Sequence, residues 1–159
     1  MKIKIIAVGK IKENYLKEGI EEYLIRLKPY AKVEIVEVPD SKVKDSPNDF
    51  DINKVKSEEG KRILDKIKSD EVVINLDLNK KELDSVEFAH FLQSKIENGG
   101  ASVTFVIGGS YGLSDEIKER ANASISLSKM TFLHQMTRLI LLEQIYRSFK
   151  ILNNETYHK

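Results

Sequence analysis

The sequence predicts an α/β protein in which a three-layer sandwich is built around a mostly parallel sheet. Short runs rich in Val, Ile and Leu alternate along the chain with segments of helical amphipathic spacing, and this strand–helix alternation occurs five times. Such alternation is typical of a sheet that carries helices on both faces. No internal repeat and no linker-like composition interrupts the pattern, so we expect one domain spanning residues 1–159.

In the first half of the chain, apolar spacing predicts two strand–helix units. Pro29 ends the first helix, because the residue before a proline avoids the helical region. The polar stretch from Ser41 to Asn53 has little to bury, so we expect a mobile loop there. The expected elements are a strand at Lys2–Val8, a helix with Leu16, Ile20, Tyr23, Leu24 and Leu27 on its inner face, a strand at Lys32–Val38 and a helix at Val55–Ile67.

The second half predicts three further units. Ser85 is a plausible N-cap for a helix, and Asn98-Gly99-Gly100 stops that helix. Ser114 starts a short helix whose acidic residues lie at the favourable end. The expected elements are strands at Glu71–Leu76, Val103–Ile107 and Ala123–Leu127, helices after Ser85 and after Ser114, and a last helix from about His134 to Leu152.

Two features stand out at the C-terminal end. The run Leu139–Leu142 points in four successive directions, so the last helix is apolar nearly all round at its middle. It is either a central core helix or a helix whose second side meets another subunit, and we favour a homodimer. The chain then ends with Tyr157 and His158, which form either a frayed terminus or a tail that brings an acid or base over a pocket.

Composition is that of an ordinary globular domain. Of the 159 residues, 41% are hydrophobic and 32% are charged, which is enough to bury a core. Cysteine is absent, which excludes disulfides and thiolate metal sites. The apolar runs at the N-terminus and in the last helix are too short for a signal peptide or a membrane span. We therefore expect a cytoplasmic protein without a membrane partner.

Net charge is only +1, so the field of the whole molecule predicts no polyanionic partner. The distribution is uneven, however, because the segment from Lys129 to the end holds five basic and two acidic residues. A basic end beside a pocket would suit phosphate groups. The same bias is also common on solvated mixed-charge surfaces, so charge alone leaves both interpretations open.

Two strands of the second half end in exposed loops. Gly108-Gly109-Ser110-Tyr111-Gly112 follows one strand, and Ser128–Phe132 follows the other. In parallel α/β sheets, small ligands bind at the carboxyl ends of strands, and glycines there let the backbone approach a ligand closely. We therefore expect the two loops to form one pocket, with the strand that ends at Leu76 as its third edge.

Local motifs restrict the chemistry further. Gly108-Gly109-x-x-Gly112 has neither the spacing of a Rossmann fingerprint nor the Gly-Lys-Ser/Thr of a P-loop, and by itself it also fits a tight turn. Ser126-x-x-Lys129 has the spacing of penicillin-binding enzymes without their companion motifs. Glu87-x-x-His90 would be half of a di-iron site, and no second copy exists. We expect no metal cofactor.

Several segments together resemble a known family over the whole chain, most specifically between Leu127 and Arg138. One of them is the opening, Lys2-Ile3-x-x-Ile6-Ala7-Val8-Gly9-Lys10. The others are Phe105-Val106-Ile107-Gly108-Gly109-Ser110-Tyr111-Gly112, Leu127-Ser128-Lys129-Met130-Thr131-Phe132-x-His134-Gln135-Met136-x-Arg138, Glu143-Gln144-x-Tyr146-Arg147 and Tyr157-His158-Lys159. The chain is similar to the bacterial large-subunit rRNA pseudouridine methyltransferases, which are minimal members of the SPOUT class of knotted methyltransferases.

The resemblance carries expectations about fold and function. It implies a C-terminal trefoil knot, in which the chain after the glycine loop threads through an earlier loop, although such threading is rare. It implies a homodimer that uses S-adenosylmethionine as methyl donor. The implied substrate is the assembled ribosome, with methylation at the N-3 ring nitrogen of a pseudouridine in 23S rRNA. The residues alone also permit a nucleotide- or phosphate-binding protein without methyl transfer, and a non-catalytic ribosome-binding factor.

The resemblance also implies the residues of the cofactor site, which belong to the same three strand ends. They are Leu76, Gly108, Leu127, Ser128, Lys129, Met130, Thr131 and Phe132. The chain departs from the family pattern at Leu133, where the family usually has Pro, and at Asn154 and Thr156, where it has small or Pro residues. Because Leu133 replaces this Pro, we expect the exit from the cofactor loop to be less rigid than in the family.

The expected chemistry is methyl displacement from a sulfonium, in which most of the catalysis is positioning. The target ring nitrogen must lose a proton, and His158 is the first candidate to assist this, with Tyr157 as the second. We expect Arg138 and Arg147 to hold RNA phosphates. Lys129 either does the same or is simply solvated.

Overall fold

The computed structural model of the chain describes residues 1–159 and contains one five-stranded, fully parallel sheet in the order β2-β1-β4-β3-β5. The expected α/β class and five strand–helix units are confirmed. In chain order the elements are β1 (Lys2–Val8), α1 (Asn14–Leu27), β2 (Lys32–Val38), α2 (Asp49–Leu64), β3 (Val73–Leu76), α3 (Ser85–Asn98), β4 (Ser102–Ile107), α4 (Asp115–Arg120), β5 (Ala123–Ile125) and α5 (His134–Leu152).

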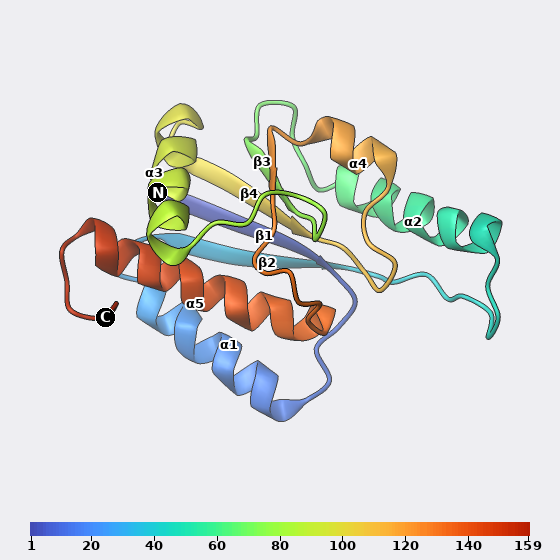
Figure 1. Ribbon diagram of the computed structural model, residues 1–159, viewed down its shortest axis with the longest axis horizontal. Helices are drawn as coiled ribbons and strands as arrows, with labels where there is room; N and C mark the ends of the chain where they lie inside the picture. Colours follow the sequence, from blue (N-terminus) through green and yellow to red (C-terminus); the bar gives the residue numbers. More distant parts are fainter.

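Helices cover both faces of the sheet, as the three-layer expectation requires. Figure 1 shows α1, α3 and α5 on one face and α2 with α4 on the other. Ile3 and Ile5 of β1 belong to the core on the α1–α3–α5 side, whereas Ile6 and Val8 belong to the core on the α2–α4 side. Because successive strand residues point to opposite faces, β1 is apolar on both sides from Ile5 to Val8, and lysines occur only in its first half, at Lys2 and Lys4.

The expected mobile loop from Ser41 to Asn53 is wrong in its second part, because α2 begins at Asp49. Asn48 and Asp51 form a capping box, in which the Asn48 side chain accepts from the Asp51 N–H and the Asp51 carboxylate accepts from the Asn48 N–H. These bonds satisfy N–H groups that the first helical turn leaves free. The polar residues that suggested a loop are therefore a helix start, and α2 ends at Leu64 rather than at Ile67.

The N-cap of α3 is Asp84 rather than the predicted Ser85. Asp84 forms a capping box with Glu87, whereas the Ser85 hydroxyl donates to the side chain of Gln144 on α5. A carboxylate facing the first-turn N–H groups also interacts well with the helix dipole. The Ser85–Gln144 bond ties the start of α3 to the last helix, beside the region where β5 ends.

Three strands end at the same edge of the sheet. β3 pairs with both β4 and β5, and the Asp77 N–H continues the ladder by donating to the Ile125 carbonyl at 2.9 Å. The next bond runs from the Ser126 N–H to the Lys81 carbonyl, also at 2.9 Å. The segment between β5 and α5 therefore lies beside the segment between β3 and α3. This pairing brings loops that are distant in sequence together.

Candidate functional site

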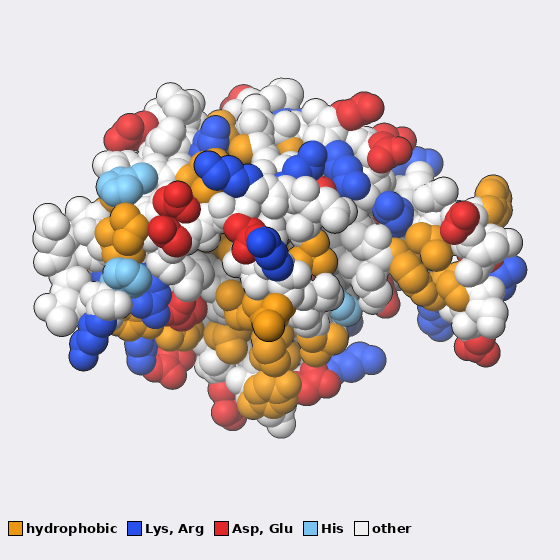
Figure 2. Space-filling model, viewed as in Figure 1, with side chains coloured by type: hydrophobic (Ala, Val, Ile, Leu, Met, Phe, Trp, Pro, Cys, Tyr) orange, Lys and Arg blue, Asp and Glu red, His pale blue; other side chains and the backbone are white.

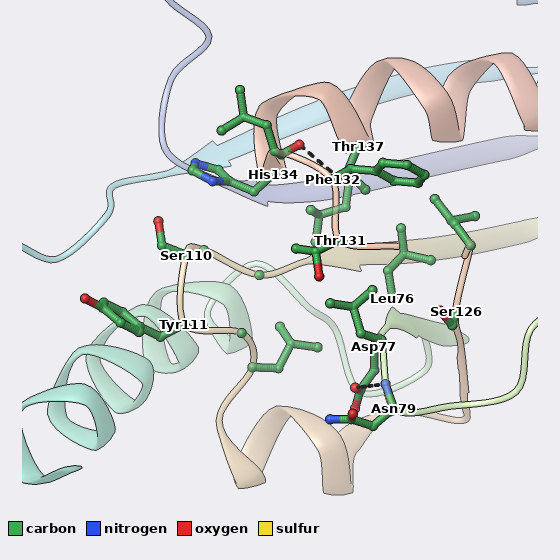
Figure 3. Close-up of a pocket in the computed structure, with 18 of the residues that line it drawn as sticks. Leu76, Asp77, Asn79, Ser110, Tyr111, Ser126, Thr131, Phe132, His134 and Thr137 are labelled. Carbon is green, nitrogen blue, oxygen red and sulfur yellow. Dashed lines mark hydrogen bonds between the residues drawn. The ribbon is translucent and has the colours of Figure 1, made fainter. Parts of the chain in front are cut away.

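A cavity of about 850 Å³ opens at this edge of the sheet. Its walls are the loops after β3, β4 and β5 together with the first turn of α5, and Figure 3 shows their side chains converging on one space. The cavity has the size that small-molecule sites usually have. The three strand ends that the sequence predicted as pocket edges, at Leu76, Gly108 and Leu127, all line it.

The structure brings together seven of the eight residues that the sequence assigned to a cofactor. These seven line the cavity and are Leu76, Gly108, Leu127, Ser128, Met130, Thr131 and Phe132. Lys129 does not line it, because its side chain is 90% exposed and lies 3.9 Å from the Glu82 carboxylate. Lys129 contributes backbone to the loop, while its ammonium group belongs to the outer surface.

The loop after β4 is a tight glycine turn that forms one wall. The Gly112 N–H donates to the Gly109 carbonyl at 3.1 Å, and Gly112 has φ +87°, a conformation that side chains disfavour. A Cβ at Gly108 would lie 2.9 Å from Leu113 Cδ2 and 3.0 Å from the Gly112 carbonyl carbon. Glycine is thus needed at 108 because the turn closes directly upon it, and the cavity wall is bare backbone there.

The loop after β5 holds itself in place with hydroxyl groups. The Ser126 hydroxyl donates to the Ser128 carbonyl at 2.8 Å, and the Ser128 hydroxyl accepts from the Met130 N–H at 3.0 Å. Met130 and Leu133 are nevertheless 73% and 52% exposed, although both are large apolar residues. Both side chains therefore offer apolar surface at the lip of the cavity.

Polar groups that the sequence analysis did not select lie on the remaining walls. Asp77 follows β3 directly; its carboxylate accepts from the Asn79 N–H and lies 4.0 Å from the ammonium of Lys118. Because Asp77 directly follows a predicted strand, the sequence could have identified it as a residue of the cavity. Ser110 and Tyr111 belong to the predicted glycine loop, but no role was assigned to them. Lys56 reaches the cavity from α2, and nothing in its local sequence indicates this.

His134 is the one imidazole on the cavity wall, and the sequence analysis gave it no role. It is half-buried at the first position of α5, and neither ring nitrogen is hydrogen-bonded within the chain. Burial lowers the pKa of His134 below its ordinary value, and the nearby Arg138 cation lowers it further, while Asp40 partly opposes both. The ring is therefore neutral near pH 7, with a free acceptor nitrogen. Figure 3 shows it across from Ser110.

The expectation that Arg138 holds an RNA phosphate is wrong. Its side chain is 1% exposed. The guanidinium donates to the Glu37 carboxylate at 2.6 Å and to the carbonyls of Val8 and Gly9 at 3.2 and 2.7 Å. These contacts fix the second turn of α5 against the ends of β1 and β2, so the residue has a structural role and is buried away from solvent.

Tyr157 and His158 lie in a different place from the cavity. The Tyr157 hydroxyl bonds to the Tyr23 hydroxyl at 3.1 Å and to the Glu143 carboxylate at 3.0 Å, and burial with these bonds raises its pKa well above the usual range. His158 Nδ1 lies 3.1 Å from the Arg147 guanidinium, which also stacks over the Tyr157 ring. The tail is thus folded along α5, and none of these residues lines the cavity of its own chain.

Two further observations concern metal ions and membranes. No group of three or more His, Asp or Glu residues is close enough to hold a metal ion. None of the helices has both the length and the apolar character needed to cross a bilayer.

Comparison with known proteins assigns the family. A family model described as "Predicted SPOUT methyltransferase" matches residues 1–158. The chain belongs to the SPOUT methyltransferase family. The expected family and enzyme class are therefore confirmed.

Relatives of this SPOUT methyltransferase match it from end to end. Proteins named "Ribosomal RNA large subunit methyltransferase H" are 54% identical in Carboxydothermus hydrogenoformans, 53% in Bacillus thuringiensis subsp. konkukian and 50% in Enterococcus faecalis. Each alignment covers 159 residues and all of both chains. The strand ends, the cavity and the tail of this SPOUT methyltransferase therefore lie within a region shared with all three.

Proposed function

We propose that the protein transfers a methyl group from S-adenosylmethionine to the N-3 ring nitrogen of a pseudouridine in 23S rRNA, within the assembled ribosome. The observation that carries this proposal is the convergence of three strand ends on one cavity in a chain of the SPOUT methyltransferase family. The names of the full-length relatives support ribosomal RNA as the substrate.

The cavity suits the proposed cofactor in both shape and chemistry. Leu76, Leu127 and Met130 offer apolar surface for an adenine ring, and the exposed backbone of the glycine turn offers polar groups for the ribose. A volume of about 850 Å³ leaves room for part of a substrate base as well. When bound, the cofactor supplies a methyl group activated by a sulfonium. The chain then has to align the acceptor nitrogen and exclude water.

The acceptor nitrogen carries a proton that must leave as the methyl group arrives. We propose that His158 accepts this proton, with Tyr157 as the second candidate. We propose further that Arg147 holds an RNA phosphate. Tyr157 is a weaker base candidate at neutral pH, because its raised pKa keeps the phenol protonated. Arg147 keeps a quarter of its side chain exposed, which leaves donors available to a phosphate.

The tail serves the cavity of a partner subunit in this proposal. Arg147 lies ten residues beyond Thr137, the last residue of α5 that lines the cavity, which is a rise of about 15 Å. A tail held beside Arg147 therefore stays apart from its own cavity. The exposed apolar residues Tyr15, Met130 and Leu133 favour a homodimer that covers them. Figure 2 shows hydrophobic side chains gathered low in the centre, over α1 and the start of α5.

The proposed knot concerns the same loops. The segment after β5 bonds to the segment after β3 through the Ser126 N–H and the Lys81 carbonyl, which supports a path in which residues 126–133 pass through the loop formed by residues 77–84. A crystal structure that traces residues 126–133 outside this loop would contradict the knotted path.

Two assays test the function and its alternatives. Calorimetry should give saturable binding of S-adenosylmethionine and no binding of ATP, whereas the reverse would favour a nucleotide-binding protein. Tritiated methyl groups should then pass to ribosomes that lack the modification and not to ribosomes that carry it. Ribosome binding without methyl transfer would instead indicate a non-catalytic ribosome-binding factor.

A further inference from the structure

Glu59 on α2 is the one carboxylate buried in the structure, and nothing in the proposed chemistry uses it. It is 4% exposed, and it forms no salt bridge. Its Oε2 accepts from the Ser41 N–H at 3.0 Å, and its Oε1 has no partner. A buried carboxylate with a free oxygen is costly, so its retention needs a reason.

The free oxygen lies directly against the glycine turn of the cavity. A Cβ built on Gly109 would lie only 2.7 Å from Glu59 Oε1 and 3.2 Å from Val8 Cγ1. The carboxyl group therefore fills the space that a side chain at 109 would need. Glycine at this position and glutamate at 59 fit together as a pair, because the backbone of the turn rests on the carboxyl oxygen.

The neighbouring residues of α2 extend this contact in both directions. A Cβ on Gly60 would lie 2.4 Å from the Ser114 hydroxyl oxygen, at the far end of the same loop. Lys56, one helical turn before Glu59, lines the cavity itself. One face of α2 thus supports the glycine loop at both ends. Glu59 also joins this loop to the loop after β2, through Ser41.

We propose that Glu59 is a positioning residue of the cofactor site, which sets the height of the Gly109 backbone above α2 and so shapes the wall that S-adenosylmethionine meets. The proposal rests on the proposed function for the identity of the ligand. It requires the bulk of the carboxyl group and not its charge. Burial raises the pKa of Glu59, and the charges of Asp40 and Glu58 raise it further, while the Ser41 N–H and Arg62 oppose the rise. The direction of this shift agrees with a carboxyl group whose charge is not needed.

Glu59→Asp and Glu59→Gln test the contact. Glu59→Asp withdraws the oxygen from Gly109 and should weaken S-adenosylmethionine binding about fivefold, raising its KM while kcat stays near wild type. Glu59→Gln keeps the shape and should bind within about twofold of wild type. Glu58→Asp is the matched control, because Glu58 also bonds Ser41 but does not touch Gly109. Equal losses in Glu59→Asp and Glu58→Asp, or a larger loss in Glu59→Gln, would overturn the proposal.

A double-mutant cycle gives an independent measurement. Gly109→Ala forces a methyl group against the carboxyl oxygen and should weaken binding about tenfold or more, whereas Glu59→Asp/Gly109→Ala makes room for it and should bind more tightly than Gly109→Ala alone. Losses that simply multiply would show that the two residues do not interact, and would also overturn the proposal.

A ligand-free measurement separates this proposal from the proposed function. In the absence of any ligand, Glu59→Asp should shift the backbone amide NMR signals of Gly109 and Ser110, and Glu58→Asp should leave them unchanged. If wild type binds no S-adenosylmethionine while these shifts appear, the proposed function fails and the positioning role stands. Unmoved signals in Glu59→Asp would overturn the positioning role itself.

Discussion

The two ends of α5 differ in the kind of group that they present. At the N-terminal end, the helix contributes His134 and Thr137 to a cavity whose other walls combine glycine-loop backbone, apolar side chains and polar groups such as Lys56, Asp77 and Ser110. At the C-terminal end, Arg147 and the tail form a cluster of charges and aromatic rings that does not line this cavity. Binding a small ligand needs backbone that approaches closely, whereas proton transfer and phosphate contact need long polar side chains. Within a single chain, the cavity and the long polar side chains therefore lie at opposite ends of α5.

The largest expected effect comes from the tail. His158→Ala should lower kcat for ribosome methylation by about 10²–10⁴-fold, the usual contribution of a general acid or base, while S-adenosylmethionine affinity stays unchanged. Single-turnover methyl transfer and calorimetry measure the two quantities. His90→Ala is the matched control, since His90 is an exposed imidazole on α3 that neither lines the cavity nor bonds to the tail. Unimpaired turnover in His158→Ala would show that His158 does not accept the proton.

Mixed dimers test whether the two ends meet across subunits. Gly108→Val should close the cavity, because even a Cβ at 108 lies 2.9 Å from Leu113 Cδ2. When the Gly108→Val and His158→Ala proteins are mixed in equal amounts and exchange subunits, half of the dimers are hybrids. Each hybrid has one intact site of its two, so activity should recover to about a quarter of wild type. Each variant alone should be nearly inactive. A mixture that stays inactive after subunit exchange would show that tail and cavity work within one chain.

The two arginines of α5 should separate stability from RNA binding. Arg138→Ala removes donors from buried carbonyls and leaves a void, so unfolding free energy should fall by about 2–4 kcal/mol. Arg147→Ala should change it by less than about 1 kcal/mol, because that pair is partly exposed. It should instead weaken ribosome binding and reduce the slope of log K against log salt by about 1. Denaturant titrations and filter binding provide the measurements, and the reverse pattern would contradict both roles.

The smallest expected effect concerns pH. Because the folded-state pKa of His134 is lowered from 6.5, the unfolded chain takes up the proton first as pH falls. The stability that neutral His134 contributes is complete above the unfolded-state value and is lost as pH falls through the folded-state value. His134→Gln should therefore lose less stability than wild type between about pH 7 and pH 5. An unchanged pH profile, with His90→Gln as control, would show that burial does not hold the ring neutral.

The sequence predicted the cavity better than it predicted the roles of the basic residues. The strand ends at Leu76, Gly108 and Leu127 could be placed because apolar runs and glycines mark where buried strands stop. Arg138 looked like a phosphate ligand because local sequence does not reveal that Glu37, on β2, faces it. His134 and Lys56 were missed for a related reason, since each reaches the cavity from an element whose direction depends on packing. Asn48 was assigned to a loop although its capping box with Asp51 was readable.

The sequence by itself determined the alternation of strands and helices, the parallel sheet and the three loops at its edge, because these depend on periodicity and turn chemistry within short segments. Only the tertiary structure decided that Glu59 supports Gly109, that Arg138 is buried and that the tail lies beside Arg147 rather than over its own cavity. Those contacts join residues between 11 and 130 positions apart in the sequence, and such contacts are set by how whole elements pack.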